Sequence, residues 1–187
     1  MTTLAEHFAK NPLNLTLNFV MTTGHLSGGK LNESAWMGQR PDLLDAKYAI
    51  CLEHFGAIEY KDVQTLFGPR YELTGQLEPM WTFANSSAAS SEYRQAYLDA
   101  FQETPGYLRM ALLDPLTTNG RRSAWYGVGG ASTLGYSDIP TVGIIPQPDY
   151  LWASAIDGGW SRWDEAQSLA QLEAIIRLIK KVDGFKS

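Results

Sequence analysis

Strand-like apolar runs alternate with helical patterns along this chain, and that order constrains the fold more than any other feature. The strand-like runs are "LNLTLNFVM" from Leu13 to Met21, "KYAICLEHFGA" and "IPTVGIIPQP". Apolar residues at helical spacing mark two longer segments, from about Ser91 to Gln102 and from about Trp163 to Val182. Such alternation predicts an α/β domain, layered helix–sheet–helix, with a mostly parallel sheet.

The two helical segments each carry one apolar face. In the first, the face consists of Tyr93, Ala96, Tyr97, Ala100 and Phe101. In the second, the stripe consists of Ala166, Leu169, Leu172, Ile176, Ile179 and Val182. Asp157 and Asp164, before or near its start, would cap turns or the start of this helix. The stretch 58–118 has turn signals such as "FGPRYELTG" among short strand-like runs. We expect it to be an irregular insertion within one domain spanning 1–187.

Length and charge exclude several classes of protein. At 187 residues the chain is one domain, or half of a larger one. A net charge of -5, with no cluster of Lys and Arg, argues against a nucleic-acid partner. No run of 18 apolar residues predicts a membrane span, and "MTTLAEHFAKNP" lacks the pattern of a signal peptide, so no membrane partner is expected. The sequence names no compartment.

Polar residues follow two of the predicted strands. His25 lies in "TTGHLSGGK" after the first run, and Glu53 and His54 lie near the end of the second. Sites in parallel sheets collect at the carboxyl ends of strands, and imidazole and carboxylate groups suit zinc binding or acid–base catalysis. The alternative from the residues alone stays open: His25 caps a turn, and Glu53 pairs with a nearby cation.

Tryptophan is concentrated before the last helix. Trp152, Trp160 and Trp163 lie in "DYLWASAIDGGWSRWDEA". These side chains could form a sugar- or peptide-binding aromatic platform, or they could pack a loop against the sheet edge before the last helix.

The order of segments resembles the C-terminal part of the zinc-dependent aminopeptidase and carboxypeptidase-like metallopeptidases, which have a phosphorylase/hydrolase-like α/β fold. The resemblance is carried by "LNLTLNFVMTTGHLSGG", by "YAICLEHFGA" and by the closing section "SDIPTVGIIPQPDYLWASAIDGGWSRWDEAQSLAQLEAIIRLI". It extends from about Leu13 to Val182, with 58–118 poorly matched.

Position by position, the resemblance implies an altered site. Glu53 matches the family's acidic zinc ligand, and His25 falls where the family has its general-base glutamate. Leu26 and Trp152 fall where the family has further metal ligands, and neither side chain can bind zinc. The family's remaining ligands lie upstream of the matched region. The resemblance therefore implies an upstream domain that supplies ligands, or a fold kept without zinc chemistry.

Two functions of different classes follow as expectations. The first is a metallopeptidase-like hydrolase domain with an altered or incomplete metal site, acting on a peptide or another small substrate. His25 is then its catalytic base, Glu53 a zinc ligand, and His54, Tyr150 and Trp152 line the substrate site. The same His25 and Glu53 could also form a hydrolytic site without metal. The second function is a non-catalytic binding or assembly domain that keeps the peptidase fold, with an upstream domain or a second copy of the chain as partner.

Overall fold

The computed structural model describes residues 1–21, 36, 39–52, 56, 58–77, 80–84, 90–105, 110–113, 117–118, 121–122, 139, 141–146 and 163–185. Its helices are α1 (Thr2–Lys10), α3 (Pro41–Leu44), α4 (Ser90–Gln102) and α6 (Glu165–Asp183). Its strands are β1 (Ala49–Leu52), β2 (Ile58–Thr65), β3 (Gly68–Leu77), β4 (Met80–Ala84), β5 (Met110–Leu113), β6 (Thr117–Thr118), β7 (Arg121–Arg122) and β8 (Thr141–Pro146). The expected mixture of helices and strands is confirmed.

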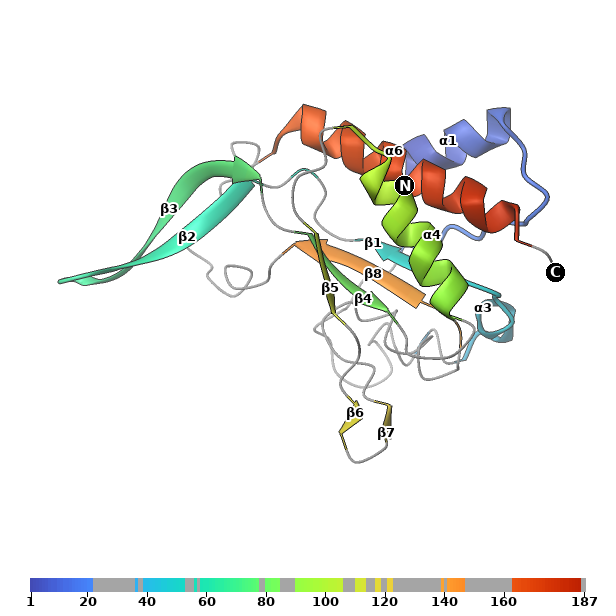
Figure 1. Cartoon of the computed structure of the whole chain (residues 1–187), viewed down its shortest axis with the longest axis horizontal. Helices are drawn as coiled ribbons and strands as arrows, with labels where there is room; N and C mark the ends of the chain where they lie inside the picture. Colours follow the sequence, from blue (N-terminus) through green and yellow to red (C-terminus); the bar gives the residue numbers. More distant parts are fainter. Residues whose placement is uncertain are drawn as a thin grey trace.

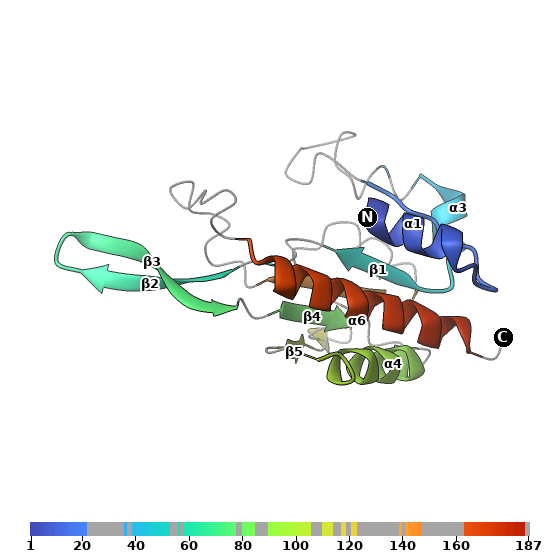
Figure 2. The same cartoon turned by 90° about the horizontal axis from the view of Figure 1, so that it is seen from above.

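Four strands form a mixed sheet in the order β1–β8–β4–β5. β1 runs parallel to β8, and β4 runs parallel to β5, but β4 runs antiparallel to β8. The chain passes from β4 through α4 to β5, which is the crossover that a parallel pair needs. α1, α4 and α6 gather over one face of this sheet (Figures 1 and 2).

The segment from Leu13 to Met21 forms no strand, so the expectation of a buried strand there was wrong. It is extended, and the alternation that suggested a strand is real. Leu13, Leu15 and Leu17 pack against the helical core, and the side chains between them are exposed. The backbone N–H of Leu15 donates to the Asp183 carboxylate at the end of α6, at 2.8 Å. An extended chain can bury every second side chain on helices as well as in a sheet, so period two alone did not distinguish the two arrangements.

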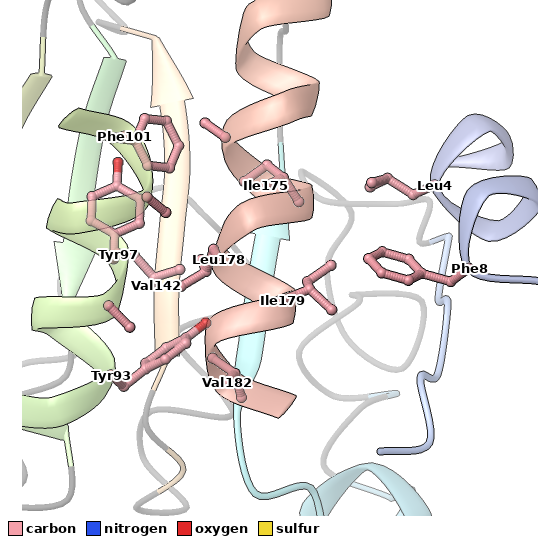
Figure 3. Close-up of a cluster of buried hydrophobic side chains, with 13 residues drawn as sticks. Leu4, Phe8, Tyr93, Tyr97, Phe101, Val142, Ile175, Leu178, Ile179 and Val182 are labelled. Atoms are coloured by element: carbon pink, nitrogen blue, oxygen red, sulfur yellow. The ribbon is translucent and has the colours of Figure 1, made fainter. Parts of the chain in front are cut away.

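The core forms where α6 lies between α1 and α4 (Figure 3). Leu4 and Phe8 of α1 point toward Ile179 from one side, and Tyr97 and Phe101 of α4 face α6 from the other. The predicted apolar face of α4 is confirmed in full, because all of its members are buried: Tyr93, Ala96, Tyr97, Ala100 and Phe101.

The buried face of α6 is rotated from the predicted stripe. Leu169, a member of that stripe, is 57% exposed, whereas Ile175 and Leu178 are fully buried. The observed buried face is Gln171, Ala174, Ile175, Leu178, Ile179 and Val182. Apolar residues extend around more than half of this helix, so its periodicity allowed more than one orientation, and packing between α1 and α4 selected one. Of the two candidate caps, Asp164 caps α6, since its carboxylate accepts a hydrogen bond from the Gln167 N–H at 2.8 Å, and Asp157 lies outside the described residues.

The stretch 58–118, expected to be an irregular insertion, has two distinct parts. β4, α4 and β5 belong to the sheet and the core. β2 and β3 instead form a separate antiparallel hairpin, which projects from the body (Figures 1 and 2). We call this hairpin, residues 58–77, the arm. None of the described helices is long and apolar enough to span a bilayer.

Candidate functional site

The carboxyl ends of β1 and β8 lie at the same end of the sheet. The two strands are parallel neighbours, with Leu52 opposite Ile144, so they end at the same edge. Glu53 and His54 follow β1 directly, and Tyr150 and Trp152 follow β8. These four residues, and His25, lie outside the described residues. The strands thus bring the starts of the Glu53 and Tyr150 segments to one edge.

The expected place of His25 rested on a strand that does not form. His25 was predicted near Glu53 because both were thought to follow parallel neighbouring strands. The segment that precedes His25 pairs with no strand. Leu13, Leu15 and Leu17 pack on the helical core, and Val20 packs against the small cluster of Leu43 and Ile139. Strand ends therefore give no reason for His25 to lie near Glu53.

Gly56, four residues beyond β1, is held against the start of α6. Its N–H donates to the side-chain oxygen Oε1 of Gln171 at 2.7 Å, and its carbonyl accepts from the Asp164 N–H at 2.7 Å. Its φ of 72° is a left-handed conformation, which glycine adopts without steric cost. A Cβ here would lie 2.8 Å from the Asp164 carbonyl oxygen and 3.0 Å from Nε1 of Trp163. We call these contacts the Gly56 clamp.

Gln171 is the polar centre of the clamp. It is 1% exposed on the buried face of α6, and a buried amide needs hydrogen-bond partners. Accepting from Gly56 satisfies its oxygen and fixes the chain between β1 and the arm. Trp163 lies beside Gly56 and is 41% exposed, so an aromatic surface stands at the base of the arm.

The arm ends in an apolar turn. Thr65 and Gly68 close the hairpin, and the Thr65 hydroxyl donates to the Gly68 carbonyl at 2.7 Å. The same oxygen accepts from the Phe67 N–H at 3.2 Å, so the turn is ordered. Leu66 and Phe67 occupy the two turn positions and are each 101% exposed. Hairpin turns of this length favour Gly, Asn and Asp, so two large apolar residues here are unusual.

Sequence reasoning missed this tip, although a signal was present. The pattern "DVQTLFGPRYELT" shows strand-like runs separated by two residues, which is hairpin spacing. The sequence predicts turns and short strands over this stretch, and Phe67 falls inside the turn signal "FGPRYELTG", but no hairpin with Leu66 and Phe67 at its tip is predicted. Their exposure follows only from the pairing of Thr65 with Gly68.

Charge on the described surface is arranged in local pairs. Nε of Arg70 lies 3.3 Å from a Glu72 carboxylate oxygen on the arm. Near α3, the Arg40 guanidinium hydrogen-bonds to Asp42 at 2.8 Å and lowers the pKa of that carboxyl. The Arg40 guanidinium also lies 4.9 Å from the centre of the Trp36 ring. These exposed pairs contribute little stability.

One tyrosine joins α4 to the sheet. The Tyr93 hydroxyl donates to the Ala49 carbonyl of β1 at 2.8 Å. Burial raises the pKa of Tyr93 well above the ordinary tyrosine value, with smaller effects from Tyr97 and Tyr48. This hydroxyl is therefore a structural donor that keeps its proton.

The described residues contain no group of three or more His, Cys, Asp or Glu side chains that could hold a metal ion. His7 is the one histidine among them. Its ring lies edge-on to Phe8 at 5.0 Å between centroids, which is a packing role. The predicted zinc ligand Glu53 lies outside this part of the chain, so zinc binding stays a prediction.

No protein-family model, curated protein or solved structure matches this chain. The metallopeptidase resemblance therefore rests on the quoted motifs alone.

Proposed function

We propose that this chain is a non-catalytic binding and assembly domain, and that the arm carries its contact surface. The observation that supports this function is the tip, where Leu66 and Phe67 are ordered by Thr65 and fully exposed. Large apolar side chains held in water at the end of a projection lose the free energy that burial would provide. Aromatic and aliphatic anchors of this kind dominate the binding energy of protein interfaces.

A second apolar element lies at the other end of the arm. Trp163, held next to Gly56, is 41% exposed at the arm's base. The tip and the base together make an elongated surface with an apolar contact at each end. In this proposal the domain keeps a metallopeptidase-like α/β fold, as half of a larger domain. Leu26 and Trp152 replace zinc ligands because catalysis has been lost.

Site-specific photo-crosslinking tests the binding function without assuming a partner. We expect p-benzoylphenylalanine in place of Phe67 to give covalent protein adducts in cells that express the full chain. The same group in place of Lys180, which is exposed on α6, is the matched control and should give far fewer. Equal yields at the two positions, or no adduct at position 67, would show that the arm is not a binding surface.

A hydrolase is the second candidate, and the sheet supports it. β1 and β8 end at one edge, and the segments that carry Glu53 and Tyr150 both start there. In this version Glu53 binds zinc, His25 acts as base, and His54, Tyr150 and Trp152 contact a peptide substrate. The test is metal analysis of the purified chain together with hydrolysis of aminoacyl substrates. A hydrolase would show bound zinc and activity that Glu53→Gln removes and that Glu6→Gln, a change at an exposed helical position, retains. A zinc-free, inactive chain would reject this candidate.

A further inference from the structure

The outer edge of β3 has no strand beside it in the described part of the chain, where β3 pairs with β2 alone. β3 runs from Gly68 to Leu77 and is the longest of the described strands. A two-stranded ribbon is only marginally stable in water, and an exposed strand edge is a template for pairing with another chain. The arm is therefore suited to β-strand addition.

The register of the hairpin determines which residues of β3 face outward. Thr65 and Gly68 form its closing pair, and such a pair exchanges backbone hydrogen bonds. Bonded and non-bonded positions alternate along an antiparallel strand, so Arg70 and Glu72 bond to β2. The backbone groups of Pro69, Tyr71 and Leu73 then point to the outer edge.

We propose that two copies of this chain associate through their arms, with β3 antiparallel to β3 and Tyr71 on the two-fold axis. This inference rests on the proposed binding function and names its partner. A two-fold interface must be self-complementary, because each residue meets the surface that its own copy presents. The register centred on Tyr71 satisfies that requirement with opposite charges facing each other.

Charge selects this register from its neighbours. Centring the pair on Arg70 would place two guanidinium groups opposite each other, and centring it on Glu72 would oppose two carboxylates. Opposed like charges destabilise a sheet. Centring on Tyr71 places Arg70 of each copy opposite Glu72 of the other. In the single chain these side chains are 73% and 49% exposed, so both are accessible for that exchange.

The same register accommodates Pro69. Proline has no N–H, so Pro69 cannot donate across the edge, and its position near the start of β3 limits the loss to one hydrogen bond at each end of the pairing. Here Pro69 lies opposite Leu73 of the second copy, and its carbonyl still accepts from that residue's N–H. The symmetric pair at Tyr71 keeps both backbone bonds.

Antiparallel arms also cover the apolar ends. With Tyr71 at the centre, Phe67 lies opposite Gly75 of the second copy, two residues from the end of β3 at Leu77. The tip of each arm therefore reaches the base of the other. Trp163 stands at that base, beside Gly56, which precedes β2. Each exposed tip thus meets an exposed aromatic side chain, and both contacts form at once.

Charge also favours a second copy over a lipid surface. The arm carries Lys61 and Arg70 against Glu59, Asp62 and Glu72, and the whole chain has a net charge of -5. Insertion of a tip into an anionic membrane requires a basic surround, which the arm lacks. Alternating charge serves self-pairing instead.

Analytical ultracentrifugation of the purified full chain, across micromolar concentrations, tests the proposal. We expect a reversible dimer. Arg70→Glu and Glu72→Arg should each weaken dimerisation by about tenfold or more, since each opposes like charges at two symmetric positions. The double variant Arg70→Glu/Glu72→Arg restores opposite charges and should restore the dimer. Leu66→Ser/Phe67→Ser should also weaken it.

Several results would overturn the proposal. These are a wild-type chain that stays monomeric, single reversals that dimerise as well as wild type, or a double variant as weak as the singles. Circular dichroism checks that every variant folds; Arg70 and Glu72 are exposed on the arm, away from the core. The photo-crosslink at position 67 separates the two levels of inference. An adduct of twice the chain mass supports self-pairing. An adduct with a different protein and no self-adduct rejects self-pairing but still supports the binding function. Cosedimentation with anionic vesicles and no self-adduct also rejects self-pairing.

Discussion

Replacing Gly56 with alanine tests the contact that joins the sheet, α6 and the arm. At a φ of 72° an alanine is strained by roughly 1–2 kcal/mol. Its Cβ would also lie 2.8 Å from both the Asp164 carbonyl oxygen and Cβ of Ser168, so the backbone must shift. That shift lengthens the bonds to Gln171 and Asp164, each worth about 1 kcal/mol. We therefore expect a loss of about 3 kcal/mol or more in the free energy of unfolding.

Thermal and urea unfolding followed by circular dichroism measure this loss. For a chain of this size, about 3 kcal/mol lowers Tm by roughly 6 °C or more. Gly68→Ala separates backbone strain from the clash, because Gly68 has a φ of 113° but no atom within 4 Å of its would-be Cβ. Gly184→Ala, at a helical φ of -84°, is the control for glycine replacement in general. If Gly56→Ala is no more destabilising than Gly68→Ala, the Gly56 clamp does not exist as described.

Three further predictions concern the core and its caps. Leu178→Ala should lower the free energy of unfolding by about 2–5 kcal/mol because Leu178 is fully buried, whereas exposed Leu169→Ala should change it by about 0.5 kcal/mol or less. Equal losses for the two variants in urea unfolding would contradict the observed orientation of α6. Tyr93→Phe should cost about 1 kcal/mol at neutral pH, because the Ala49 carbonyl loses its donor. The raised pKa of Tyr93 also determines how stability changes with pH. Below about pH 10 this tyrosine is protonated in both states, and above about pH 10 it ionises first in the unfolded state, so the wild-type free energy of unfolding falls. In alkaline unfolding curves, the free energy of unfolding of Tyr93→Phe should therefore fall less steeply than that of the wild type. Asp164→Ala should cost about 0.5–2 kcal/mol in thermal unfolding, since it removes the cap of α6; no measurable change would mean that the cap is dispensable.

Local patterns predicted much of the fold correctly. The face of α4 follows from helical spacing alone, because its apolar residues form one narrow row that can bury in only one way. β1 and β8 follow from short apolar runs bounded by breakers, and the Asp164 cap follows from its position before an apolar helix.

Predictions failed where a segment could bury its residues on more than one surface. The alternating residues from Leu13 to Leu17 fit a sheet or a helical layer equally well. In the structure the backbone N–H of Leu15 donates to the Asp183 carboxylate at the end of α6, which holds this segment on the helices. α6 is apolar around much of its circumference, so packing against α1 and α4 determined which of its faces is buried. The predicted site depended on strand ends, and the strand expected before His25 is absent from the sheet.

The sequence by itself determined the two long helices α4 and α6 and the short apolar runs that form β1 and β8, because these depend on neighbours a few residues apart. Only the tertiary structure decided that a glutamine at position 171 belongs in the core, since its partner Gly56 is 115 residues away in the chain. Likewise, only the pairing of β2 with β3 places the apolar pair Leu66–Phe67 at an exposed hairpin tip. Burial and exposure depend on which distant surfaces meet, and that information is not local to any segment.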